Sequence, residues 1–119
     1  MSKVEIKQET HEAGGHQVDV LQLAGQLDAH TFNTLQTELE GLVTADTPRV
    51  VLDFSGLEYI SSAGLAVLKK MSREFRAKEG DIRLAALPLK IKNVISLLGF
   101  DQVIQVHDDV AGALASFKE

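Results

Sequence analysis

Apolar and polar residues alternate along the first part of the chain, which is the pattern of a β-strand with one exposed side. Val4 and Ile6 alternate with charged neighbours, and a pair of glycines separates them from a second run, Gln17–Leu23. The two runs predict a hairpin with a loose loop. In the second run the apolar phase changes between Val20 and Leu21, which indicates a bulge or burial on both faces of the sheet.

The period changes at Thr31: counted from Phe32 as position i, apolar residues recur at i+3, i+7, i+10 and i+11, as on one face of an amphipathic helix. A second helix is predicted from the apolar spacing between Leu65 and Phe75. Pro88 opens a short third helix, and Gly99 is a natural stop beyond its end. A final helix follows the aspartates at 108 and 109, either of which can cap it.

Further strands are expected between these helices. The run Val50–Phe54 is almost continuously apolar, as in a central strand covered on both faces, and Asp53 comes at its end. Alternating residues at 82–86 and a short apolar run at 103–106 predict two more. The order ββαβαβαβα indicates one α/β domain over residues 1–119. We expect a mixed sheet of parallel strands plus an N-terminal hairpin, packed by helices.

Composition excludes several classes of function. The 119 residues include no cysteine, so a disulfide scaffold, a thiolate metal site and a cysteine nucleophile are all impossible. The net charge is −5 and only 5% of residues are aromatic, which disfavours nucleic-acid binding. The four histidines lack metal-ligand spacing, so we expect no metal and no cofactor. Without an apolar segment long enough for membrane insertion, a cytoplasmic protein is expected.

One segment, Asp53–Leu65, is a candidate for chemistry because it runs from the central strand into the second helix, with Glu58 expected in a loop. Its two serines have a simple explanation, since serine is a favoured N-cap residue. A hydroxyl at this place is also accessible, and a phosphate on it would meet free N–H groups and the helix dipole. Both readings, a structural cap and a modified serine, remain open from the residues alone.

Two enzyme classes fit this segment and its neighbours poorly. A serine hydrolase requires Gly-x-Ser-x-Gly, but Ile60 stands where the first glycine belongs. Gly14–Gly15 joins two strands instead of leading into a helix, so it cannot form a phosphate-binding loop. We therefore expect no catalytic residue and no enzyme activity.

The chain resembles the STAS domain of anti-sigma factor antagonists, the SpoIIAA-like and RsbV-like proteins. The resemblance rests on Gly25-Gln26-Leu27-Asp28 before the first helix and on Ile60-Ser61-Ser62-Ala63-Gly64-Leu65 after the central strand. It covers essentially the whole chain, because the order of elements also matches. It therefore implies a single STAS domain over residues 1–119, a binding module of bacterial signal transduction.

The family's phosphorylated serine lies two residues before the glycine of this loop, which places it at Ser62. Ser61 occupies a position that is often aspartate in the family and offers a second hydroxyl, so it is the alternative phosphorylation site. The resemblance also implies a partner-binding surface formed by both motifs and the first helix's start: Gly25, Leu27, Asp28, Thr31, Ser61, Ser62, Ala63, Gly64 and Leu65.

The mechanism implied by the resemblance is partner switching that regulates transcription. The unphosphorylated protein sequesters a GHKL-type serine kinase, itself the anti-sigma factor, and so releases a sigma factor. Phosphorylation reverses this binding, and a PP2C-type phosphatase restores it. Two alternatives remain: an unphosphorylated docking subunit of a transporter or other signalling complex, and a weak nucleotide-binding protein. No extended exposed apolar stripe is visible in the sequence, so a monomer is expected.

Overall fold

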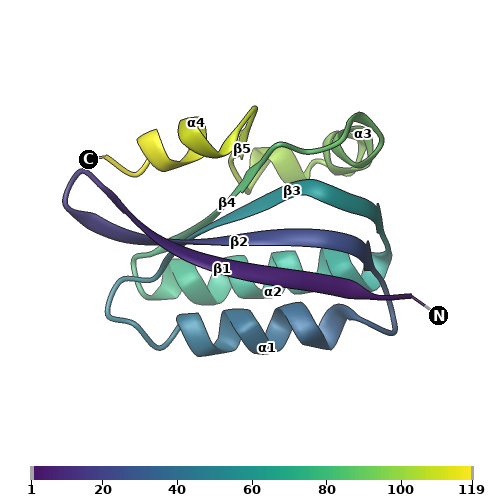
Figure 1. Ribbon diagram of the computed structural model, residues 1–119, viewed down its shortest axis with the longest axis horizontal. Coiled ribbons are helices and arrows are strands. Elements are labelled where there is room, and N and C mark those ends of the chain that lie inside the picture. Colours follow the sequence, from purple (N-terminus) through teal and green to yellow (C-terminus); the bar gives the residue numbers. More distant parts are fainter. Residues whose placement is uncertain (1, 119) are drawn as a thin grey trace.

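A mixed sheet with the strand order β1-β2-β3-β4-β5 forms the middle of the molecule (Figure 1). The computed structural model describes residues 2–118. Its strands are β1 (Val4–Ala13), β2 (His16–Leu27), β3 (Arg49–Ile60), β4 (Asp81–Ala85) and β5 (Val106–His107). Its helices are α1 (Phe32–Leu42), α2 (Ser62–Ala77), α3 (Leu89–Leu97) and α4 (Val110–Ala115), with a 3-10 turn η1 (Phe100–Gln102).

The pairing of the strands agrees with the predicted topology. β1 is an edge strand, antiparallel to β2. The remaining neighbours, β2 with β3, β3 with β4 and β4 with β5, are all parallel. The α/β fold with a mixed sheet, an N-terminal hairpin and packed helices is therefore confirmed.

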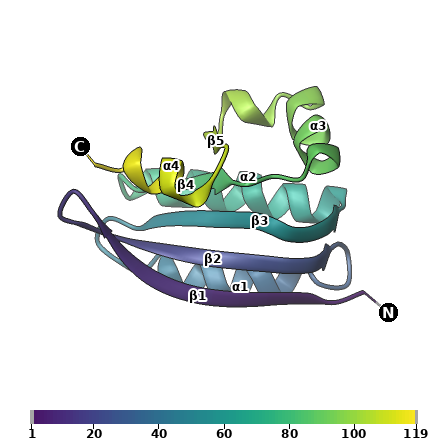
Figure 2. The same cartoon turned by 45° about the horizontal axis from the view of Figure 1, so that its top comes forward.

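Helices cover the two faces of the sheet unequally. α1 and α2 run side by side along one face, while α4 lies over the other (Figures 1 and 2). Leu21 contributes to the larger core with α1 and α2, and Val20 belongs to a smaller cluster with Ala113 of α4. The phase change predicted in β2 is thus burial on both faces, because consecutive strand residues point to opposite sides.

The hairpin loop between β1 and β2 is tight, which corrects the expectation of a loose loop. Ala13 pairs directly with His16, so only Gly14 and Gly15 make the turn. Both glycines have positive φ, at 58° and 86°. This combination is typical of a type I′ turn, which matches the twist of the two strands and which residues with a Cβ rarely adopt.

β3 continues well beyond its predicted end, so two expectations about this segment are wrong. Asp53 does not end the strand, and Glu58 lies within β3 instead of a loop. The strand extends because β2 also extends: Ala24 pairs with Gly56, and Leu27 pairs with Ile60. Backbone hydrogen bonds to a neighbouring strand sustain this segment where its own polar residues indicate a loop.

The strand predicted at 103–106 is mostly absent as well. The chain turns at residues 103–105, directly after η1, and β5 comprises only Val106 and His107. Ile104 is buried, but its N–H donates to the Phe100 carbonyl at 2.8 Å instead of to a neighbouring strand. Likewise β4 ends at Ala85, because Ala86 adopts a positive φ.

Candidate functional site

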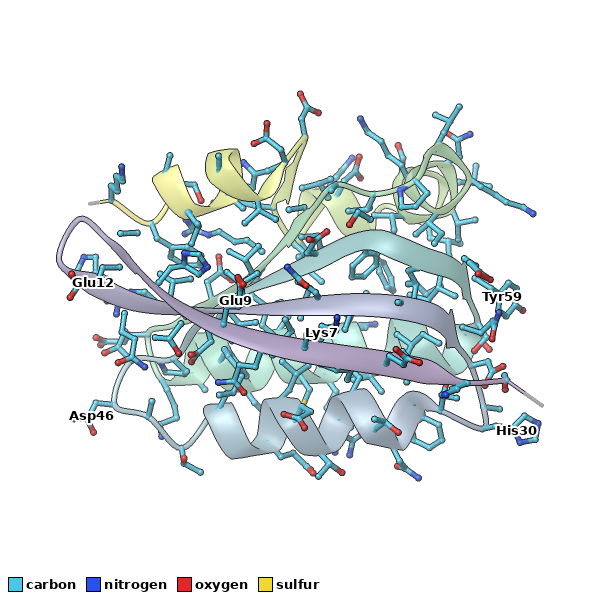
Figure 3. The ribbon with its side chains drawn as sticks, in the orientation of Figure 1. Lys7, Glu9, Glu12, His30, Asp46 and Tyr59 are labelled. Carbon is cyan, nitrogen blue, oxygen red and sulfur yellow. The ribbon has the colours of Figure 1, made fainter. Side chains whose placement is uncertain are left out.

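Both sequence motifs meet at one end of the sheet, where β2 and β3 run side by side to their carboxyl ends. Leu27 pairs with Ile60, and the Ser61 N–H donates to the Leu27 carbonyl at 2.9 Å. The start of α2 is thereby tied to the residue before Asp28. Figure 3 shows His30, in the β2–α1 loop, and Tyr59, near the end of β3, at this same end.

The two serines at the start of α2 have opposite environments. Ser62 is the first helical residue and is exposed. Ser61 is the N-cap residue, but its hydroxyl is buried and makes no hydrogen bond with any residue between 2 and 118. The expected serine cap is thus present in backbone position without its side-chain bond. Ser62 carries the accessible hydroxyl.

Gly64 is required by packing. A Cβ at this position would lie 2.9 Å from Leu27 Cγ, 2.9 Å from Ile60 Cγ1 and 3.0 Å from the Leu27 carbonyl oxygen. Contacts this short force neighbouring atoms to move. Gly64 therefore lets the first turn of α2 rest on the ends of both strands. It is itself buried, as is Leu65, whereas Ala63 is half-buried.

The Gly25–Asp28 segment is held by the residues just before β1. Gly25 has φ of 101°, and a Cβ there would collide with the Lys3 carbonyl oxygen, so only glycine fits. The Gln26 N–H donates to that same carbonyl at 2.8 Å. The Gln26 side chain in turn donates to Glu58 of β3 at 3.1 Å. This segment therefore has a defined path beside the end of β3.

Thr31 fixes the β2–α1 loop through hydrogen bonds of its hydroxyl within the loop, and this hydroxyl does not bond to an N–H of α1. Its buried hydroxyl donates to the Gln26 carbonyl at 2.8 Å and accepts from the Asp28 N–H at 2.9 Å. Asp28 accepts a hydrogen bond from the His30 N–H at 2.9 Å through its carboxylate. Thr31 therefore stands at the N-cap position of α1 without a side-chain cap, and a hydrogen-bonded turn precedes the helix.

The carboxylate of Asp28 is stabilised in its charged form. The approach of the Ser2 hydroxyl, which falls short of full hydrogen-bond geometry, lowers the pKa of this carboxyl. The backbone N–H of His30 lowers this pKa further, and burial opposes both effects more weakly; the Thr31 hydroxyl and the nearby His30 imidazole lower it by less. Asp28 is thus a fixed negative charge in the loop tied to the start of α2.

The predicted partner-binding residues divide into two groups by exposure. Four of them are buried and support the exposed residues of the site: Leu27, Thr31, Gly64 and Leu65. The others are at least partly exposed and can be reached from solvent: Gly25, Asp28, Ser61, Ser62 and Ala63. Sequence reasoning missed Tyr59, the chain's only tyrosine, whose side chain is 52% exposed near the end of β3. A lone aromatic residue directly before the Ile60–Leu65 motif was the signal for it.

This arrangement is suited to recognition and modification. It presents one reachable hydroxyl at a helix N-terminus, where no side chain of residues 2–118 caps α2. The free N–H groups of a first helical turn favour an added negative charge. Within residues 2–118 no group of three or more His, Asp or Glu side chains is placed to hold a metal ion. No helix in that range is long and apolar enough to cross a membrane.

A family model described as the STAS domain matches residues 8–113, which is most of the chain. The chain belongs to the STAS domain family. The motifs at the ends of β2 and β3 lie within the matched region, so the family resemblance read from the sequence is confirmed.

Curated relatives of this STAS domain carry related names. BtrV of Bordetella bronchiseptica, named as an anti-sigma factor antagonist, is 33% identical over 81% of this chain and 83% of its own length. The anti-sigma-F factor antagonist RsfA of Mycobacterium tuberculosis is 28% identical over 82% of this chain and 77% of its own length.

Solved structures share the fold. An anti-sigma factor antagonist from Mycobacterium paratuberculosis has a TM-score of 0.85 at 23% identity, covering 98% of this chain and 96% of that one. SpoIIAA in its unphosphorylated form has a TM-score of 0.76 at 18% identity, covering 94% and 95%. The murine anion transporter Slc26a9 matches 87% of this chain with only 17% of its own, with a TM-score of 0.73 at 19% identity.

Proposed function

We propose that this STAS domain is an anti-sigma factor antagonist whose binding to a GHKL-type serine kinase is controlled by phosphorylation of Ser62. The observation that carries the proposal is the exposed Ser62 side chain in the first turn of α2, beside the Gly25–Asp28 segment. The N-cap residue of this helix makes no side-chain hydrogen bond to it. The names of two curated relatives, both anti-sigma factor antagonists, support the same function. The protein is then a binding module of the cytoplasm, acted on by enzymes without being one.

The environments of the two serines favour Ser62 over Ser61 as the modified residue. A kinase can reach the exposed Ser62 hydroxyl without disturbing the fold. The Ser61 hydroxyl is buried, so phosphate transfer to it requires the start of α2 to detach from Leu27. Local opening of a packed helix start costs free energy that transfer to Ser62 avoids.

Phosphorylation acts in this proposal through local charge and volume. The phosphate brings about 1.5–2 negative charges to the exposed end of α2. There it meets free N–H groups, so the modified domain stays folded. The same charge, added near the Asp28 carboxylate, stands inside the surface that the kinase must cover. Release of the kinase follows from this charge, and removal of the phosphate by a PP2C-type phosphatase restores binding.

The test begins with the protein isolated from its own cells under several growth conditions. Peptide mass spectrometry should find a phosphate on Ser62 whose occupancy changes with condition. Tagged Ser62→Ala and Ser62→Asp variants, expressed in the same cells, should differ in what they retain. We expect the alanine variant to co-purify with a GHKL-type kinase and the aspartate variant to lose it.

Ser61→Ala is the matched control, because it removes the neighbouring hydroxyl and leaves Ser62 in place. With the retained kinase and ATP, this variant should be phosphorylated and Ser62→Ala should not. Phosphate on Ser61 alone would keep the switch and contradict the choice of residue. Equal kinase binding by Ser62→Ala and Ser62→Asp contradicts the mechanism.

The alternative function, an unphosphorylated docking subunit, predicts the opposite result for the phosphorylation of Ser62. The match to part of the murine anion transporter indicates that this fold also occurs inside larger membrane proteins. For that function, Ser62 should carry no phosphate in any condition, and the domain should co-purify with a transporter component. The same mass spectrometry and co-purification therefore distinguish the two functions.

A further inference from the structure

A groove on the far half of α2 has no part in the proposed switch. It is a cavity of about 280 Å³ between α2 and the segment from the end of α3 through η1. Lys69, Ser72 and Arg73 form the α2 wall, and Leu98, Phe100 and Val103 lie opposite. Lys69 comes seven residues after Ser62, so about 10 Å of helix separates the groove from the start of α2.

The apolar wall of this groove is exposed, which corrects the expectation of no extended apolar stripe. Leu98 and Val103 of this wall are 55% and 53% exposed, and Leu97 and Leu89 on α3, which do not line the groove, are exposed too. The third helix therefore buries Ile91 and Ile95 and leaves other apolar side chains in water. A group of exposed large apolar residues beside a cavity is a feature of ligand sites.

The α2 wall of the groove carries two positive charges. Lys69 and Arg73 are one helical turn apart, and among the described residues neither forms an ion pair. Like charges at this spacing repel each other when no anion lies between them. The local charge therefore complements an anion that the chain itself does not supply.

The cavity also contains a polar group without a partner. Ser72 lines it, its side chain is only 2% exposed, and its hydroxyl has no hydrogen-bond partner among residues 2–118. A buried hydroxyl of this kind costs free energy unless something bonds to it. Arg76 closes the end of the groove, because its guanidinium is held by Asp81 and by the Val103 carbonyl.

We propose that this groove binds a small organic acid with an apolar body. The carboxylate lies between Lys69 and Arg73, and the Ser72 hydroxyl, which is covered in the free protein, turns toward the cavity to donate a hydrogen bond to it. The body packs against Leu98, Phe100 and Val103. The cavity volume, near the lower end of the ~300–1,000 Å³ of typical ligand pockets, favours a small occupant over a large one. The groove lacks a glycine-rich phosphate loop, which favours a carboxylate over a nucleotide.

The probe for the test is 4-phenylbutyrate, and its neutral counterpart is 4-phenyl-1-butanol. Titration of the ¹⁵N-labelled full chain at low salt should give saturable shift changes confined to residues 69–76 and 98–104. Lys69→Glu and Arg73→Glu should each weaken binding at least about fivefold. Lys70→Glu is the matched control, because Lys70 is exposed on the same helix but does not line the groove. It should change the affinity by less than about twofold.

Ser72→Ala tests the proposed hydrogen bond from the Ser72 hydroxyl to the carboxylate without changing any charge. Since the hydroxyl has no partner in the free protein, this variant should fold at least as stably as the original chain. Its affinity for 4-phenylbutyrate should nevertheless fall. Unchanged affinity in this variant overturns the placement of the carboxylate.

Four other results overturn the proposal as a whole. They are equal binding of the alcohol, equal losses in Lys69→Glu and Lys70→Glu, binding of ATP without binding of 4-phenylbutyrate, and shifts at the groove that depend on protein concentration alone. The last result would mean that a second copy of the chain covers the groove. None of these results bears on the phosphorylation of Ser62.

Discussion

The two halves of β3 form a natural comparison, because one continuous strand carries out two tasks. Its first half, Arg49–Asp53, is hydrogen-bonded between β2 and β4, and Val51 and Leu52 belong to different cores on opposite faces. Its second half, Ser55–Ile60, pairs with β2 alone among the strands of residues 2–118, and only Leu57 and Ile60 in it are buried. The first half stabilises the domain, and the second half places the start of α2.

The same division appears in the pairing of β2 with β3. Register shifts occur between Gln22 and Ala24 and between Gly25 and Gln26, both in the half that leads to the site. Bulges of this kind redirect side chains and are common beside functional sites. Regular pairing thus accompanies the core, and irregular pairing accompanies the surface that we propose a partner contacts.

The largest difference between the halves should appear on truncating a side chain in each. Leu52 is fully buried, so Leu52→Ala should lower the free energy of unfolding by about 2–5 kcal/mol through lost contacts and a cavity. Ser55→Ala, three residues along the same strand, is the matched control. Its side chain is exposed, and the change should stay within about 0.5 kcal/mol. Urea unfolding followed by circular dichroism measures both, and similar losses in the two variants would contradict the division.

An intermediate effect is expected where the second half supports α2. Gly64→Ala places a Cβ against Leu27 and Ile60, so the free energy of unfolding should fall by about 1–3 kcal/mol in spite of alanine's helix propensity. Gly41 is also helical, but a Cβ added there would meet no atom within 4 Å. Gly41→Ala should therefore raise the same quantity by up to about 1 kcal/mol. Thermal melts of the pair would disprove this explanation if both changes had the same sign.

The smallest effect concerns the polar loop that follows β2. Because the folded pKa of Asp28 lies below its ordinary value of about 3.9, its charge stabilises the fold above that pH. This contribution disappears as the pH falls through the folded pKa. Asp28→Asn lacks it at every pH, so the difference in unfolding midpoint should be constant near neutrality and vanish in strong acid. A difference that persists at about pH 2 would show that charge is not its cause.

How far the site could be read from the sequence differs from residue to residue. The motifs at Gly25–Asp28 and Ile60–Leu65 were recognisable, and the structure places them together because parallel strands end at the same edge. That the Ser61 hydroxyl is buried and Ser62 is exposed was not readable, since adjacent serines have the same local propensity. Tyr59 and the pairing of Gln26 with Glu58 likewise depend on the neighbouring strand.

The sequence alone determined the order of the elements and the helical faces of α1 and α2, because these follow from local periodicity and turn chemistry. Only the tertiary structure decided where β3 ends, since its polar second half is held by hydrogen bonds to β2 and not by its own pattern. It also decided that Ile104 fills the core from a turn and that α3 leaves apolar side chains exposed. These outcomes depend on contacts between segments that are far apart in the sequence. Periodicity within a single segment carries no information about such contacts.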